Sequence, residues 1–298
     1  MKIKRLFALI LILFTSSSFC ISSRAQQQNA TMIYSHTAKT FVSFEAMIRN
    51  LADKEFIVLG ENHDNAAHHD MQKKIMDAVA VYGPISVGLE FISWDNQEHL
   101  NHFILGDITE EDFLKKVKWG DGFPFDFYRP LIFAATQSGG HAFGINAPNW
   151  IVKKVARGGL DSLTNDELTY IPTNFEIGSD LYFKRFKKVM SNIGGGMPQF
   201  QIKRMFAAHS IWDDSMAFHS ILNMQHSYAP FFIIVGNFHA SYKLGLTARL
   251  DKRLHGSEKI STIVHVDASN LNSHDELLKV VEKHKDYGEL ADFTIFTF

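Results

Sequence analysis

The segment "EFIVLGENHDNAAHHDMQ", residues 55–72, passes from a strand pattern to a helix pattern within a few residues. An apolar, β-rich run ends at Gly60, where the chain can turn, and polar side chains follow at once. Apolar residues then recur at helical spacing at Met71, Ile75 and Val79, which predicts a helix over residues 65–82. The segment therefore predicts a strand whose end gathers carboxylate and imidazole groups, namely Glu61, His63, His68 and His69.

The same alternation of short apolar runs with helical patterns continues along the chain. Further strand-like runs begin at Ile85, His141, Phe231, Ser261 and Phe293. Such alternation is typical of α/β proteins, in which each strand is followed by a helix that returns over the sheet. We therefore predict a three-layer α/β fold, with a mainly parallel sheet flanked by helices.

Residues from about 159 to 227 interrupt this alternation. They contain no convincing strand, a Gly-Gly-Gly stretch at 194–196, and a long helical pattern from Gln199 toward His226. We predict a helical insertion between the third and fourth strands. Such an insertion either covers the mouth of a site or forms a plain packing layer, and the pattern leaves both interpretations open.

The first 25 residues have the pattern of a signal peptide. Basic residues precede an apolar run at 6–14 that is too short to span a bilayer, and Ser23-Arg24-Ala25 offers a cleavage site. We expect a mature domain at 26–298, exported to the periplasm or the cell surface. A lipid anchor at Cys20 is disfavoured because the bulky Phe19 precedes it. Cleavage after Ala25 would leave a mature chain without cysteine, which excludes disulfides and thiolate metal sites.

Composition narrows the class of protein further. The chain has 298 residues, 46% of them hydrophobic, which suffices for a sizeable core. Lys and Arg number 30 against 32 Asp and Glu, and the net charge of -2 gives no reason to expect nucleic acid as a partner.

Polar residues follow four of the predicted strands at their carboxyl ends, where ligands bind in open parallel sheets. Two of these loops, "GENH" at Gly60 and "GNFH" at Gly236, share the form Gly-x-x-His. Imidazoles and carboxylates in one crevice suit a divalent metal or general acid/base chemistry. The alternative is that the histidines only cap loops and hydrogen-bond to buried carboxylates. The candidates are Glu61, His63, Glu90 and His239, with Asn146 and Asn237 beside them.

Other polar residues receive plainer interpretations. His68 lies on the face of its helix that carries Met71, so we expect it at the sheet interface, whereas His69 is expected to face solvent. His209 and Asp213 lie one helical turn apart. They form either a helix-stabilising pair or a support that orients a site histidine.

Five blocks of the sequence resemble, in order, those of the ChaN family of haem-binding uptake proteins, which shares a superfamily with the Tiki metalloproteases and the erythromycin esterases. The blocks are "VLGENHDNAAHHDMQ", "GLEF", "WGDGFPFDFYRPLIFAATQSGGHAFGINAPNWIVKKVARGGLDSL", "WDDSMA" and "VGNFH", and the resemblance spans residues 55–250. It implies a metal or acid/base role for the Glu and His positions at 61, 63, 90 and 239. It places the family's Tyr-x-Pro block at Tyr128 and Pro130.

The resemblance also implies haem as the cofactor, bound through a tyrosine and enclosed by a homodimer, with outer-membrane haem and iron uptake machinery as a partner. A phenolate favours the ferric iron expected outside the cytoplasm. Tyr182 and Tyr170, in the helical insertion, are the first candidates, and Tyr128 is the next. The aromatic and basic run at 183–186 could stack on a porphyrin and pair with its propionates, or could simply form a helix with one buried face.

Two functions of different classes follow. The first is haem binding for iron acquisition, which the resemblance favours. The second is a metal-dependent or metal-free hydrolase that uses the Glu/His cluster, which the residues themselves favour. The absence of a G-x-S-x-G motif argues against an ordinary serine esterase.

Overall fold

The computed structural model describes residues 31–120, 122–193, 196–256 and 258–298. The predicted signal peptide and Cys20 lie outside these ranges, so export remains a prediction. Within them, none of the helices has the length and apolar character needed to cross a membrane.

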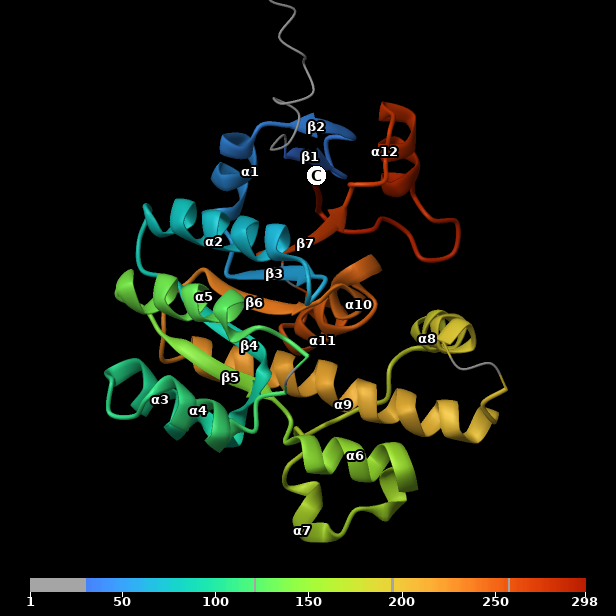
Figure 1. Ribbon diagram of the computed structural model, residues 1–298. Coiled ribbons are helices and arrows are strands. Elements are labelled where there is room, and N and C mark those ends of the chain that lie inside the picture. Colours follow the sequence, from blue (N-terminus) through green and yellow to red (C-terminus); the bar gives the residue numbers. More distant parts are fainter. Residues whose placement is uncertain (1–30, 121, 194–195, 257) are drawn as a thin grey trace, which may run out of the picture.

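One eight-stranded sheet forms the centre of the molecule, in the order β2-β1-β8-β7-β3-β6-β4-β5 (Figure 1). The pairings among β3 to β8 are all parallel, whereas β1 is antiparallel to both β2 and β8. The strands are β1 (Met32–Ser35), β2 (Thr40–Val42), β3 (Phe56–Glu61), β4 (Ser86–Ser93), β5 (Ala142–Asn146), β6 (Phe231–Gly236), β7 (Ile260–Asp267) and β8 (Phe293–Thr297). The predicted α/β fold with a mainly parallel sheet is confirmed.

Helices cover both faces of this sheet, as Figure 1 shows. The first half of the chain supplies α1 (Phe44–Leu51), α2 (Ala66–Ala80), α3 (Gln97–Leu105), α4 (Glu110–Val117), α5 (Phe125–Gln137), α6 (Asn149–Gly158) and α7 (Asn165–Leu168). The second half supplies α8 (Asp180–Ile193), α9 (Gln199–Met224), α10 (Asn237–Ala240), α11 (Leu246–Arg253) and α12 (His274–Val281). Three 3₁₀ turns lie at Trp94–Asn96, Leu160–Ser162 and Ser241–Lys243.

Strand β3 shows why the sheet needs a helical layer on each face. All six of its residues are buried, and successive side chains point to opposite faces. Ile57 and Leu59 pack in a core with residues of α2 and α5. Phe56 and Val58 pack in a second core with residues of α9 and α11.

The structure adds two elements to the prediction. Strands β1 and β2 are short and only partly buried, so they lack the apolar runs that mark β3 to β8. Between β5 and β6 the described residues contain helices and turns but no strand. Helix α9 in this segment packs against α6, α11 and β5. It therefore brings side chains of the segment toward the sheet.

Candidate functional site

The two Gly-x-x-His loops lie side by side because β3 and β6 are parallel neighbours, with Glu61 in register with Gly236. A side chain at either glycine would force a neighbouring group to move. A Cβ at Gly236 would lie 2.7 Å from Cε1 of His63, and one at Gly60 would lie 2.7 Å from Oδ1 of Asn237. The glycines thus leave the space that lets the polar groups of both loops approach each other.

Glu61 is the centre of the first polar group, and its carboxylate is fully buried. Oε1 accepts a hydrogen bond from the Tyr128 hydroxyl at 2.6 Å and lies 3.0 Å from Nδ1 of His63. Oε2 accepts from Nε2 of Gln72 at 2.9 Å and lies 3.1 Å from Nδ1 of His69. Burial and the charge of Glu61 raise the pKa of the Tyr128 hydroxyl, which keeps it a neutral donor.

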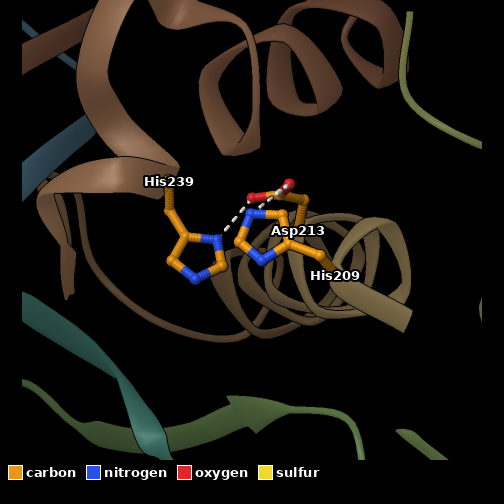
Figure 2. Close-up of side chains that lie close together, drawn as sticks. All are labelled: His209, Asp213 and His239. Carbon is orange, nitrogen blue, oxygen red and sulfur yellow. Dashed lines mark hydrogen bonds and ion pairs between the residues drawn. The ribbon is translucent and has the colours of Figure 1, made fainter. Parts of the chain in front are cut away.

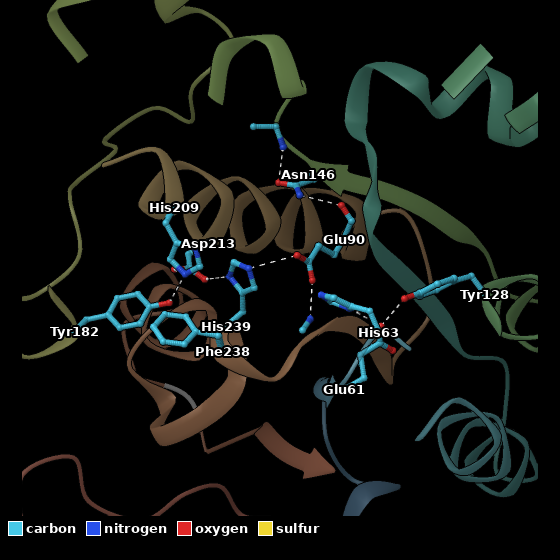
Figure 3. Close-up of polar contacts among 12 residues, drawn as sticks. Glu61, His63, Glu90, Tyr128, Asn146, Tyr182, His209, Asp213, Phe238 and His239 are labelled. Atoms are coloured by element: carbon cyan, nitrogen blue, oxygen red, sulfur yellow. Dashed lines mark hydrogen bonds and ion pairs between the residues drawn. The ribbon is translucent and has the colours of Figure 1, made fainter. Parts of the chain in front are cut away.

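His239 is the centre of the second polar group (Figure 3). Its Nδ1 lies 2.7 Å from Oδ1 of Asp213 and its Nε2 lies 3.3 Å from Oε1 of Glu90. Burial alone would lower the pKa of His239, but the two carboxylates outweigh it and raise the pKa to about 10. Burial likewise opposes ionisation of Glu90, but the charge of His239 outweighs it and lowers the Glu90 pKa to about 2. His239 is therefore an imidazolium held between two carboxylates.

His209 lies against this group from α9, as Figure 2 shows. Its ring stacks on that of His239, with ring centroids 4.3 Å apart. Burial and the neighbouring charge of His239 lower the pKa of His209 to about 3, so the ring is neutral. Its Nε2 accepts a hydrogen bond from the Tyr182 hydroxyl at 2.7 Å. It also lies 3.7 Å from Oδ2 of Asp213.

The two polar groups meet at Gly236. The amide of Gly236 donates to Oε2 of Glu90 at 2.6 Å, and the His63 ring lies against the same glycine. Burial lowers the pKa of His63, but its hydrogen bond to Glu61 and the charge of Glu90 outweigh that effect, so the pKa is raised. The His63 side chain keeps 29% of its surface exposed, which makes it more accessible than His239.

A pocket of about 500 Å³ opens onto this junction. Its polar lining includes His63, Glu90, His209 and His239. Its aromatic lining is formed by Phe91, Trp119, Phe123 and Trp212. The arrangement can bind a small organic molecule with an apolar part and present it to acid/base groups.

The two predicted supporting asparagines form hydrogen bonds that fix the loops, mainly with backbone groups. Asn146 lines the pocket, but its Nδ2 donates to the carbonyl of Glu90 at 2.9 Å and its Oδ1 accepts from the amide of Ala147. Asn237 donates to the carbonyl of His265 at 2.7 Å and to Oδ1 of Asn62 at 3.0 Å.

The four predicted metal ligands lie near one another at the carboxyl edge of the sheet. His63 pairs with Glu61, His239 pairs with Glu90, and Glu90 also feels the charge of His63. Among the described residues, the group with metal-ligand spacing is His209, Asp213 and His239, whose ligand atoms all lie within 4.8 Å of one another (Figure 2). His209 and Asp213 were predicted only to support the site, so their position shifts any metal hypothesis from β3 toward α9.

The three candidate tyrosines lie in three different environments. Tyr128 and Tyr182 are fully buried, and each hydroxyl is bonded to a side chain of the polar groups. Burial and the charge of Asp213 raise the pKa of Tyr182 well above its usual value. Tyr170 is only half-buried, and its ring lies 5.7 Å from that of Trp94 and 5.0 Å from that of Trp150.

His69 is buried, which contradicts the prediction from the sequence. It was expected to face solvent but is 3% exposed, pairs with Glu61 and stacks on Phe127 at 4.7 Å. Helix α2 buries two stripes rather than one, and His69 belongs to the second with Gln72 and Met76. The spacing of three and four residues is visible in the sequence. Two of the three residues are polar, however, so the pattern does not predict a buried face.

Comparisons with known proteins agree with this architecture. A family model described as "Haem-binding uptake, Tiki superfamily, ChaN" matches residues 47–250, more than half of the chain. A solved structure described as "Cofacial heme binding to ChaN of Campylobacter jejuni" superposes with a TM-score of 0.65 at 17% identity, covering 89% of this chain and 96% of that chain.

More remote structures share less of the fold. The type III effector HopBA1 superposes with a TM-score of 0.46 at 10% identity, covering 84% of this chain and 90% of its own. A mutant of the erythromycin esterase EreC gives 0.44 at 14% identity, covering 76% and 73%. No curated protein sequence matches. Because the family model covers more than half of its length, the chain belongs to the ChaN family of haem-binding uptake proteins in the Tiki superfamily.

Proposed function

We propose that this protein binds haem for iron acquisition, and that Tyr170 supplies the ligand to the iron. Membership of a haem-binding family supports the cofactor. The observation that carries the choice of ligand is the accessibility of Tyr170, which is half-buried while Tyr128 and Tyr182 are fully buried. Within the described ranges no hydrogen bond engages the Tyr170 hydroxyl, whereas the other two hydroxyls are bonded to Glu61 and His209.

The surroundings of Tyr170 suit a porphyrin. The Trp150 ring meets it edge-on and is 46% exposed, so it offers an aromatic surface for stacking. Trp150 also lines a surface depression of about 570 Å³ together with Lys153 and Arg157 of α6. Both basic side chains are exposed and lie one helical turn apart. They can pair with the two propionates of a haem whose ring lies on Trp150.

The test is a titration of the mature protein with ferric haem, followed by absorption spectroscopy. Wild-type protein should show a tyrosinate charge-transfer band, and Tyr170→Phe should remove the band and weaken binding at least tenfold. Tyr228→Phe is the control and should change neither, because Tyr228 is 47% exposed and stacks on His141 rather than on a tryptophan. An unchanged spectrum in Tyr170→Phe would assign the iron to another residue, and Tyr182→Phe and Tyr128→Phe would then be measured.

Acquisition requires that the protein be exported and that it pass the haem on. We infer a soluble mature chain that begins at Gln26, binds haem as a homodimer, and delivers it to uptake machinery in the outer membrane. Intact-mass measurement of the secreted protein tests the cleavage site. A diacylglyceryl group on Cys20 would instead establish a lipid anchor. Light scattering with and without haem tests whether the dimer depends on the cofactor.

A second candidate function is hydrolysis in the pocket at the carboxyl edge of the sheet. The observation that favours it is the meeting of His63 with the Glu90–His239 pair in one aromatic-lined pocket. His63 is the accessible imidazole and suits a general base for a water molecule, while Glu90 is held ionised by His239. If His239 gave up its proton, the group of His209, Asp213 and His239 could instead bind a divalent metal, which would supply a polarised water.

This candidate is tested without haem. The metal content is measured in the protein as isolated and again after addition of Zn²⁺. One ion should bind per chain, and His209→Ala should abolish this binding. A panel of carboxylic esters and amides asks whether His63→Ala abolishes turnover. Absence of turnover with every substrate in wild-type protein, together with absence of metal, would leave haem binding as the only function proposed.

A further inference from the structure

A second pocket, of about 270 Å³, lies on the side of α11 and is lined mostly by charged residues. Helix α11 contributes Arg249, Lys252 and Arg253, helix α9 contributes Asp214, and the segment before α8 contributes Asn174 and Glu176, with His255 beyond the end of α11. None of these residues lines the pocket at the carboxyl edge of the sheet.

Two of the three cations in this pocket are already neutralised. Arg253 binds Asp214 through two hydrogen bonds, from Nε to Oδ1 at 2.8 Å and from Nη2 to Oδ2 at 2.6 Å. Lys252 forms an ion pair with Glu176, and both side chains are largely exposed. These pairs engage both carboxylates of the pocket. Glu176 also feels the charge of Arg249, but in the described residues no hydrogen bond or ion pair joins the two side chains.

Arg249 is the third cation, and it is left without a partner. The residue is 8% exposed, and its buried Nη2 atom has no hydrogen-bond partner. In the part of the chain that the structure describes, its guanidinium makes neither a hydrogen bond nor an ion pair. The charge of Arg249 contributes to the lowered pKa of Asp213, but Oδ1 of Asp213 is already bonded to His239.

A buried guanidinium without acceptors is expensive, because it loses its hydration and gains no hydrogen bonds in return. Such a group persists where a ligand completes it. The planar fork of Arg249 matches the oxygen atoms of an oxyanion, and the neighbouring cations add to the positive potential of the pocket. The Asn174 side chain lines the same pocket and can contribute an amide donor.

We propose that this pocket is a binding site for a small oxyanion, a carboxylate or a phosphate group, with Arg249 as the residue that binds it. The site is separate from the Glu/His groups and from Tyr170, and it does not depend on haem binding.

The test compares inorganic phosphate, acetate and chloride at equal ionic strength, with thermal unfolding of the full mature chain as the readout. Phosphate or acetate should raise the unfolding midpoint of wild-type protein above the value in chloride, because a ligand that binds only the folded state stabilises it. Arg249→Met should abolish this difference. The larger shift, with phosphate or with acetate, identifies which oxyanion the site prefers.

Two further variants test whether the anion effect depends on Arg249. Arg129→Met is the matched control, since Arg129 is paired with Glu110 and Asp126 on the opposite side of the sheet and should keep the full anion effect. If Arg249→Met does not fold, Arg249→Lys keeps the charge but loses the fork, and calorimetric titration should show at least tenfold weaker binding than in wild type. Equal shifts in wild type and the Arg249 variants, or no shift with either oxyanion, overturn the proposal.

Discussion

His209 and His239 stack with their ring centroids 4.3 Å apart, yet their pKa values move in opposite directions, to about 3 and about 10. The difference comes from their partners. His239 lies between the carboxylates of Glu90 and Asp213, whereas His209 accepts a hydrogen bond from a neutral phenol. One charge is therefore localised on one ring of the stack, and a second proton on the pair would bring two cations into contact.

The first prediction concerns stability in acid. His209, His265 and His68 have folded-state pKa values lowered from 6.5 to about 3, 3 and 4, mainly by burial. Between these values and 6.5 the unfolded chain binds more protons than the folded chain, so the free energy of unfolding falls as pH falls below 6.5. Each such histidine contributes a slope of about 1.4 kcal/mol per pH unit. Urea unfolding between pH 4 and pH 7 measures this slope. A free energy of unfolding that stays constant over this range would contradict the prediction.

The second prediction concerns stability in base. The folded-state pKa of His239 is raised to about 10, so its contribution is fully present below pH 6.5 and is lost as pH rises from 6.5 through 10. The same unfolding measurement, extended to pH 10, should show this decline in wild-type protein and not in His239→Gln. Stability should therefore be greatest near neutral pH.

The third prediction concerns Asp213→Asn. The change removes one of the two carboxylates that hold the His239 imidazolium and leaves only Glu90, so we expect a loss of about 1.5–3 kcal/mol in the free energy of unfolding, typical of a hydrogen bond to a charged group. The pKa of His239, followed by NMR, should also fall. Asp214→Asn is the matched control, because Asp214 is buried and paired with Arg253. It should also destabilise the protein but leave the His239 titration unchanged.

The fourth prediction concerns the glycine between the two polar groups. In Gly236→Ala the new Cβ would lie 2.9 Å from Nε2 of His63, so either the ring or the loop must move. We expect a loss of about 1–3 kcal/mol, typical of overpacking, and a changed His63 titration. Gly122→Ala, at a position with no atom within 4 Å of the added Cβ, should have little effect. Equal stability of the two variants would contradict the close contact.

The fifth prediction concerns the contribution of the Tyr128 hydroxyl to stability, measured in the absence of haem. Tyr128→Phe removes a donor to the buried Glu61 and should cost about 1–3 kcal/mol. Tyr82→Phe, at a side chain that is 63% exposed, serves as the control and should be neutral.

The strands of the sheet could be predicted because their apolar runs are long and bounded by turn residues. Each of the six runs became one of β3 to β8, and the residues at their carboxyl ends met as parallel pairing requires. Strands β1 and β2 were not predicted, because a partly buried strand of three or four residues shows no clear periodicity of apolar residues.

The helical half of the site could not be predicted in the same way. Sequence spacing placed His209 and Asp213 on one face of α9, but the direction of that face depends on how the whole helix packs against α6, α11 and β5. Tyr182 shows the same limit, since its aromatic and basic neighbours left open both contact with haem and a helix with one buried face. Its burial against Phe206 and Phe238 depends on contacts between separate helices.

Strand β8 lies inside the sheet, between β7 and β1, although its residues are 293–297. During synthesis, one edge of β1 and one edge of β7 must therefore stay unpaired until residues 293–297 have been added. The sheet can thus close only after the last of these eight strands has been made.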